Sequence, residues 1–181
     1  MVKDDGIISK ISDEHFIATT TTGGAATVLG CMEEYAQTEW PNLNVYMNSI
    51  TEQFATFNIS GPKTREIMNK VFPEIDFSND AFPFMTFQFH NYQGMKIRIL
   101  RASFTGEMGY EIYIPSKNAS KIWNELHSHG KDFGLIPYGT ETMHLLRAEK
   151  GYIIVGQDTD GSITPIDLGL NWTIGKTKQD F

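Results

Sequence analysis

Two neighbouring stretches of the chain alternate between apolar and polar residues, which is typical of half-buried strands. Residues 95–103 and 109–115 each place their apolar side chains on one face. A hairpin of two antiparallel strands is therefore predicted. Its connection, residues 104–109, contains two glycines and one acid, Glu107. Glycine in such a connection adopts a positive φ angle or allows another group to approach the backbone closely.

Apolar residues recur every three or four positions in four other segments, which predicts amphipathic helices. The expected helices are residues 24–37, a helix around residues 62–72, a helix that follows a cap at Ser116, and residues 140–150 before Gly151. A strand is expected between the acidic pair and the turn before residue 15, and residues 15–24 are expected to be a strand that runs into the start of a helix. Further strands are expected at residues 43–50 and 52–59, and at the end of the turn-rich tail 156–175.

The order of these elements determines the fold class. Helices that follow pairs of strands predict an α+β fold, with antiparallel sheets covered by helices. The two halves of the chain repeat a similar order without similar sequence, which indicates a weak pseudo-repeat. Its seam is expected near residues 73–83, and residues 1–181 are expected to form one domain.

Composition and charge exclude several classes of partner and site. The 181 residues carry a net charge of −7 and no basic stripe, which argues against a nucleic-acid partner. No apolar run is long enough to span a membrane. The N-terminal residues include acids, which a targeting peptide would lack. The single cysteine, Cys31, excludes an internal disulfide framework and favours a reducing, cytoplasmic compartment. The five histidines show no spacing typical of metal ligands, so no metal is expected.

Glu107 has two interpretations on pattern alone. A carboxylate in a turn is most often simply solvated. A carboxylate between two glycines in a stiff hairpin is also suited to holding a ligand, because little rotamer freedom is left to lose. The hairpin by itself does not decide between them.

Three patches together resemble a known family. They are "KDDGIISKISDEHF" near the start, "RASFTGEMGYEIYIP" in the middle, and "GLIPYGTETMHLLRAEKGYIIVGQDTDGSITPIDLGLNW" toward the end. The chain resembles, over essentially its whole length, the folate-binding family of the glycine-cleavage T-protein (aminomethyltransferase), dimethylglycine dehydrogenase and sarcosine oxidase. The third patch is most similar to the branch found in the alpha subunit of heterotetrameric sarcosine oxidase.

The resemblance implies a fold, a cofactor and partners. The fold would be the aminomethyltransferase folate-binding fold, with two ferredoxin-like halves. The cofactor would be tetrahydrofolate, whereas FAD, FMN and NAD would belong only to the parent complex. The partners would be folate and the other subunits of a heterotetramer. The family domain normally begins before the acidic pair and is followed by a smaller β-rich domain, so a fragment of a larger subunit is expected. Gly6 departs from the apolar residue usual in the T-protein branch, which predicts a looser strand.

The resemblance also implies roles for polar residues. Glu107, the acid of the "TGE" motif, would accept hydrogen bonds from the pterin. Arg147, in "LLRAEKG", would face the folate pocket; the alternative is a surface charge paired with Glu149 or Glu141. Asp4 would be the catalytic carboxylate of the acidic pair, beside the folate nitrogens. Neighbouring residues of an extended strand point to opposite faces, so Asp4 and Asp5 are not both expected to reach the ligand.

Aromatic residues and glycines complete the candidates. Tyr110, Phe104 and Tyr152 would supply walls for the flat folate rings, and core packing is the alternative for each. The glycine-rich stretch 19–26 lacks the spacing and the lysine of phosphate-binding loops, so a strand-to-helix turn is the better interpretation.

These expectations lead to one function and two alternatives. The predicted function is to capture the one-carbon unit of oxidised sarcosine as 5,10-methylenetetrahydrofolate within a flavin-dependent oxidoreductase complex. The fragment alone would not act as an oxidase. The alternatives are a stand-alone aminomethyltransferase-like enzyme, and a non-catalytic folate-fold module used for assembly.

Overall fold

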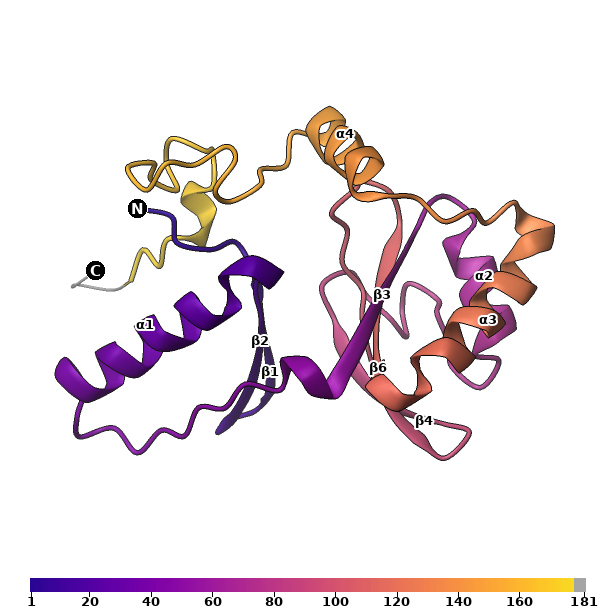
Figure 1. Ribbon diagram of the computed structural model, residues 1–181, viewed down its shortest axis with the longest axis horizontal. Helices are drawn as coiled ribbons and strands as arrows, with labels where there is room; N and C mark the ends of the chain where they lie inside the picture. The colour runs from indigo at the N-terminus through magenta and orange to yellow at the C-terminus, as the bar shows by residue number, and fades with distance from the viewer. Residues whose placement is uncertain (178–181) are drawn as a thin grey trace. The chain divides into compact units, whose positions relative to one another are not determined.

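The computed structural model describes residues 1–177, and these fall into two compact units. The first unit contains Met1–Asn48 and the chain from Ile153 onward, and the second is Ser49–Tyr152. Each unit is described by itself below, with the element labels of Figure 1.

The first unit is built on a hairpin and one helix. Strands β1 (Ile7–Ser12) and β2 (His15–Thr19) pair antiparallel, with Ile7 opposite Thr19. Helix α1 (Ala25–Thr38) follows a 3₁₀ turn, and none of its residues is fully buried. The segment that contains Ile163 returns to the start of the chain, because the backbone N–H of Val2 donates to the carbonyl of Ile163 at 2.8 Å.

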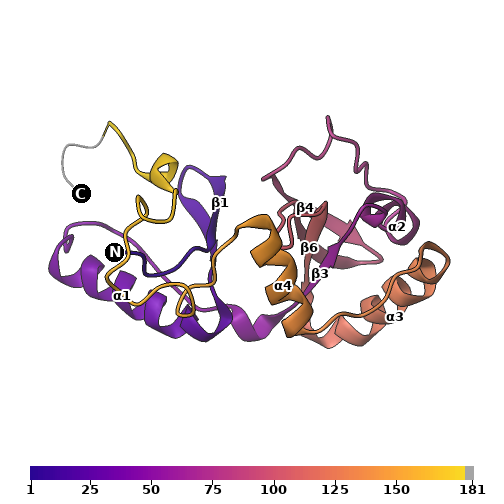
Figure 2. The ribbon, with the colours of Figure 1, turned by 90° about the horizontal axis from the view of Figure 1, so that it is seen from above.

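The second unit holds the main hydrophobic core. Its antiparallel sheet has the order β3-β6-β5-β4, formed by Phe54–Ser60, Gly109–Pro115, Met95–Leu100 and Phe87–Tyr92. Helices α2 (Thr64–Val71) and α3 (Ala119–Gly130) lie side by side against this sheet (Figures 1 and 2). Isoleucines of the sheet pack with α2 and α3 in one cluster of buried side chains. Helix α4 (Thr140–Lys150) precedes the end of the unit.

Several predicted elements are confirmed, and two of them have the predicted bounds. The hairpin forms as β5 and β6, with Ile99 opposite Ile112. Strand β6 and helix α4 have the predicted limits, and Gly151 ends α4 in the left-handed conformation at φ 86°. Both elements are marked by local signals, alternation in the strand and a glycine cap after the helix.

Other expectations were wrong. Residues 44–50 are neither strand nor helix, because a strand needs a hydrogen-bonded neighbour and this segment pairs with none within the described residues. The strand expected at the end of the tail is a 3₁₀ turn at Asn171–Thr173. Strand β4 was missed inside an aromatic segment that lacks clean alternation. Helix α2 begins at Thr64, two residues beyond Pro62.

The segment 73–83, expected to hold the seam of a pseudo-repeat, lies inside the second unit. Its side chains Phe77 and Phe82 are fully buried in the core and stack with ring centroids 5.7 Å apart. The division between the two compact units falls after Asn48 and after Tyr152. Among the described residues, no helix is long and apolar enough to cross a membrane.

Candidate functional site

The connection between β5 and β6 requires glycine at two positions. Gly106 has φ 83°, and a Cβ there would lie 2.7–2.8 Å from the methylene groups of Lys150. A Cβ on Gly109 would lie 2.7 Å from the carbonyl oxygen of Ala102. The structure thus confirms both expected uses of glycine, a positive φ angle and a close approach. Glu107 is exposed between these two constrained positions.

The start of the same connection is held by hydrogen bonds. The backbone N–H of Arg101 donates to Thr86 at 2.9 Å, and its guanidinium donates to the carbonyl of Phe82 at 2.6 Å. Two hydroxyls further along, on Ser103 and Thr105, are buried and have no hydrogen-bond partner within the described part of the chain. The backbone is therefore anchored, while polar groups of the loop retain unused hydrogen-bonding capacity.

Arg147 lies in the last turn of α4. Its Nε donates to the carbonyl of His144 at 3.1 Å, and its Nη1 donates to the carbonyl of Tyr152 at 2.9 Å. These bonds hold the chain that leaves the helix. Arg147 and Lys150 are three residues apart and so lie on neighbouring positions of one helix face. Because the Lys150 stem covers Gly106, this end of α4 lies against the Glu107 connection.

The three aromatic candidates differ in exposure. Tyr110 is fully buried, with its ring edge-to-face against Phe77 at 5.2 Å and Phe82 at 5.6 Å. Tyr110 is therefore a core side chain, which is the alternative given above to a wall of the folate pocket. Phe104 is half-buried in the connection itself, and Tyr152 is 36% exposed. The second unit thus contains all the folate-binding candidates. Of the three aromatic ones, Phe104 and Tyr152 have surface available to a ligand.

The acidic pair, Asp4 and Asp5, belongs to the first unit. Backbone N–H groups donate to Asp4, whereas the feature that marks Asp5 is a raised pKa. The Asp4 carboxylate accepts the backbone N–H of Gly6 at 2.9 Å. It also accepts the N–H of Thr21, at 3.2 Å to Oδ1 and 3.3 Å to Oδ2. Partial burial of the Asp5 carboxyl raises its pKa, and the neighbouring charge of Asp4 raises the pKa further. Gly6 permits a close approach, because a Cβ there would lie 1.9 Å from the carbonyl oxygen of Thr19.

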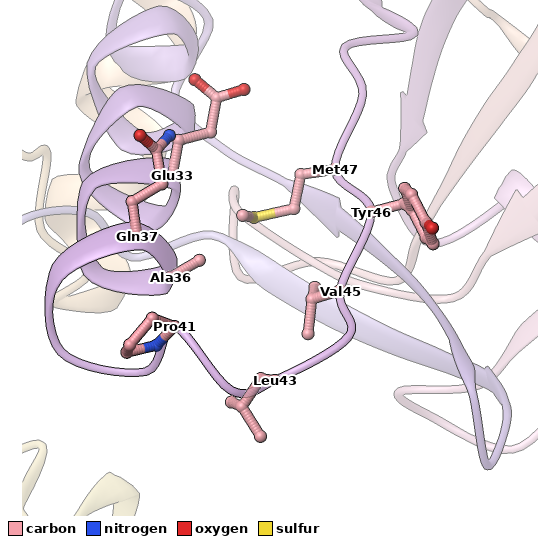
Figure 3. Close-up of a pocket in the computed structure, with 8 residues that line it drawn as sticks. All are labelled: Glu33, Ala36, Gln37, Pro41, Leu43, Val45, Tyr46 and Met47. Atoms are coloured by element: carbon pink, nitrogen blue, oxygen red, sulfur yellow. The ribbon is translucent and has the colours of Figure 1, made fainter.

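An open hollow of ≈ 470 Å³ also lies in the first unit, between α1 and the extended segment that follows it. Figure 3 shows Glu33 and Gln37 on the helix side and Met47 pointing toward them, while Tyr46 points away. None of the predicted site residues lines this hollow. Its lining is largely exposed and contributes no feature to the Glu107 site.

Lys150 and the hydroxyls of Ser103 and Thr105 were missed by sequence reasoning. Lys150 stands inside the motif "LLRAEKG", but nothing in its spacing indicates that its stem covers a glycine far away in the sequence. The hydroxyls gave no signal, because serine and threonine are ordinary residues of a connection.

Comparison with known proteins adds three observations. The family model described as the GCVT N-terminal domain matches residues 1–178. The sarcosine oxidase subunit alpha of Corynebacterium sp. (strain P-1) is 51% identical over 100% of this chain, which spans 19% of that subunit. The corresponding subunit of Rhizobium meliloti (strain 1021) is 40% identical over 99% of this chain and 18% of its own length.

Similarity to aminomethyltransferases is weaker. The aminomethyltransferase of Flavobacterium psychrophilum is 30% identical over 99% of this chain and 48% of that protein. The crystal structure of the glycine cleavage system aminomethyltransferase T from Bartonella henselae superimposes with a TM-score of 0.75 at 24% identity, covering 96% of this chain and 44% of that one. This likeness confirms the expected aminomethyltransferase fold, with mixed helices and antiparallel sheets.

The chain spans about a fifth of the sarcosine oxidase subunits and about half of the aminomethyltransferases that it matches. The family model, in contrast, matches almost its whole length. The chain belongs to the family of the GCVT N-terminal domain.

Proposed function

We propose that this chain is a tetrahydrofolate-binding domain that captures a one-carbon unit released by oxidation of an amine such as sarcosine. The observation that carries the proposal is the presentation of Glu107. Its carboxylate stands exposed between Gly106 and Gly109, neither of which has room for a side chain. The relatives named as sarcosine oxidase alpha subunits support the choice of amine.

The geometry fits the chemistry of a pterin. A pterin presents a ring N–H beside an exocyclic amino group, and one carboxylate accepts both bonds in parallel. Because the connection is anchored at Arg101 and constrained at both glycines, Glu107 would lose little conformational freedom on binding. The unpartnered hydroxyls of Ser103 and Thr105 show that the loop is not saturated by internal hydrogen bonds within the described residues. Bound tetrahydrofolate would supply the two amine nitrogens that take up the carbon as 5,10-methylenetetrahydrofolate.

The other candidates have supporting roles in this proposal. Arg147 would hold the end of α4 against the connection and offer its guanidinium to the folate. Phe104 and Tyr152 would contact the folate rings, and Tyr110 would support the hairpin from the core. A carboxylate of the pair formed by Asp4 and Asp5 would take the proton that the folate amine loses.

The larger assembly is also part of the proposal. The parent protein would be a cytoplasmic enzyme whose flavin oxidises the amine in a region outside these residues, with FAD, FMN and NAD bound there. Other subunits would complete it, by analogy with relatives that are themselves named as alpha subunits.

Calorimetric titration with 5-formyltetrahydrofolate, a stable analogue, tests the proposal. Wild-type protein should bind saturably, and Glu107→Ala should weaken binding by more than about 100-fold, because two charge-assisted hydrogen bonds are lost. Glu66→Ala, an exposed acid in the first turn of α2, is the matched control and should bind normally. Saturable binding that survives Glu107→Ala would refute the site, and absence of binding by the folded chain would refute the function at the level of this chain.

The second candidate function is that of a stand-alone aminomethyltransferase. The 30% identity to the Flavobacterium psychrophilum protein favours it, although the sarcosine oxidase subunits are more similar. The two functions differ in the carbon donor. Folate-dependent consumption of an aminomethyl group from a protein carrier would support the transferase, whereas consumption of formaldehyde or an imine alone would support the oxidase domain.

A further inference from the structure

Lys150, the last residue of α4, combines a packed stem with a free charge. A Cβ built on Gly106 would lie 2.7–2.8 Å from Cβ, Cγ and Cδ of Lys150, so the stem of the lysine covers that glycine. The residue is nevertheless exposed, and no ion pair joins it to Glu107 or to any other carboxylate of the described residues. Since only two bonds separate Cδ from Nζ, the positive charge lies beside the connection that carries Glu107.

We infer that Lys150 is a specificity-determining residue of the folate site, whose ammonium donates a hydrogen bond to the carbonyl oxygen at C4 of the pterin while Glu107 accepts from the two donors next to it. This inference rests on the proposed folate site. It deepens that proposal by naming the group that selects a 4-oxo ring.

The pterin edge that faces a carboxylate carries three hydrogen-bonding groups in a row. They are the exocyclic amino group, the ring N–H and the carbonyl oxygen at C4. A carboxylate accepts from the first two, but it has no donor for the third, because an ionised carboxylate is only an acceptor. Recognition of the whole edge therefore needs a donor beside the carboxylate. An ammonium suits this place, since it has three donors and no acceptor.

The packing of Lys150 places a donor where this edge requires one. Its stem contacts Gly106, the residue directly before Glu107, so the ammonium and the carboxylate can reach one ligand edge from neighbouring positions. Contact along the stem restricts the side chain before a ligand arrives, which reduces the conformational freedom lost on binding. No ion pair within residues 1–177 has to break before the ammonium meets the ligand.

Two simpler roles are also open to this side chain. The charge lies in the last turn of α4, where a cation interacts favourably with the helix dipole. The stem also fills the space over Gly106. Lys70 provides a control for the first role, because it is an exposed cation in the last turn of another helix of the same unit, α2.

Three variants separate these roles from ligand recognition. Lys150→Met keeps an unbranched stem over Gly106 and removes the charge and the donors. Lys150→Ala also removes most of the stem. Lys70→Met removes a charge from the equivalent turn of α2. The urea midpoint of Lys150→Met should match that of Lys70→Met, so that any difference in ligand binding between these two variants is not a difference in stability.

Calorimetric titration with 5-formyltetrahydrofolate gives the first readout. Lys150→Met should weaken binding by about 10- to 100-fold, the size expected for loss of a hydrogen bond from a charged donor, and Lys70→Met should bind as the wild type does. Normal binding by Lys150→Met, together with weakened binding by Glu107→Ala, would overturn this inference and leave the proposed function intact. Absence of binding by the wild-type protein would overturn both.

Comparison of folic acid with aminopterin gives the second readout and separates the ring from the anionic tail. The two ligands have the same tail, but aminopterin carries an amino group at C4 and lacks the neighbouring ring N–H. Affinities are measured by displacement of 5-formyltetrahydrofolate. Wild-type protein should prefer folic acid, and Lys150→Met should reduce that preference by about tenfold or more, because only folic acid loses a bond to the ammonium.

The missing ring N–H of aminopterin affects its contact with Glu107 equally in both proteins, so the change in preference reports on Lys150 alone. An equal loss of affinity for the two ligands would assign Lys150 to the shared tail and overturn the inference. A preference that is the same in wild-type protein and in Lys150→Met would overturn it as well.

Discussion

Substitution of Gly106 by alanine should be unusually costly, because two separate penalties apply at this position. The residue has φ 83°, and the stem of Lys150 occupies the space that a Cβ would need. Gly134 offers a matched control in the same unit. Its φ is 76°, but a Cβ there would meet nothing within 4 Å. Comparison of Gly106→Ala with Gly134→Ala therefore isolates the packing penalty from the backbone penalty.

The magnitudes follow from these geometries. The left-handed conformation costs a non-glycine residue about 1–2 kcal/mol. Alanine recovers roughly 0.4–1 kcal/mol by restricting the unfolded chain, so Gly134→Ala should lower the free energy of unfolding by about 1 kcal/mol. Gly106→Ala should lower it by a further 1–3 kcal/mol or so, the usual cost of overpacking, because the contacts at 2.7–2.8 Å must open.

Urea denaturation provides the assay. Trp123 is the tryptophan of the second unit, so a background with Trp40 and Trp172 replaced by phenylalanine lets fluorescence report on that unit alone. Lys150→Ala should recover part of the packing penalty in the double variant, since it removes two of the three methylene groups in contact. The reasoning would be refuted if Gly106→Ala cost no more than Gly134→Ala, or if Lys150→Ala recovered nothing. Folate affinity should fall in Gly106→Ala and stay unchanged in Gly134→Ala.

Three further predictions concern the core and the pH dependence of stability. Tyr110→Phe should lower the free energy of unfolding by at most about 1 kcal/mol, since it loses one long hydrogen bond at 3.5 Å. Tyr110→Ala should lower it by about 3–5 kcal/mol, because it leaves a cavity beside Phe77. Burial lowers the pKa of His90 from 6.5, so the unfolded state binds more protons and stability should be lost as the pH falls below about 6.5. Burial, and then the hydrogen bond that Tyr92 donates to Glu125, raise the pKa of Tyr92 to about 12, so stability should fall as the pH rises above 10.

Each of these predictions has a direct measurement. Equal urea midpoints for Tyr110→Phe and Tyr110→Ala would contradict the core assignment. Melting temperatures measured between about pH 7.5 and 5 should depend less on pH in His90→Gln, with exposed His15→Gln as the control. Tyrosinate absorbance should show a lower Tyr92 pKa in Glu125→Gln, and an unchanged titration would exclude Glu125 as a cause.

Sequence reasoning succeeded where the signal is local. Strand β6 is marked by its own alternation, and helix α4 is bounded by the glycine that ends it, so both were predicted with their observed limits. The use of glycine at 106 and 109 followed from the lack of a Cβ, which is a property of the residue itself. The same reasoning failed at residues 43–50, whose alternating pattern is that of a strand, because pairing depends on a neighbour that the pattern does not specify.

The candidate site shows the same limit. The motif around Glu107 could be identified from the chain, since its residues are adjacent and their types suit a carboxylate that binds parallel donors. The contact between Gly106 and Lys150 could not, because the two residues are 44 positions apart by their numbering and only the folded chain brings them together. The hydrogen bond from the N–H of Thr21 to the carboxylate of Asp4 likewise joins residues that are 17 positions apart in the sequence.

The sequence by itself determined the fold class, the hairpin with its glycine-flanked acid, and the residues that resemble a folate site. These depend on periodicity, on the conformational freedom of glycine and on adjacent residues, all of which are properties of short segments. Only the tertiary structure decided that Tyr110 is buried in the core, that Lys150 covers Gly106, and that Asp4 is already engaged by backbone amides. Burial and hydrogen bonding between distant segments arise from packing, and no local pattern specifies the partner.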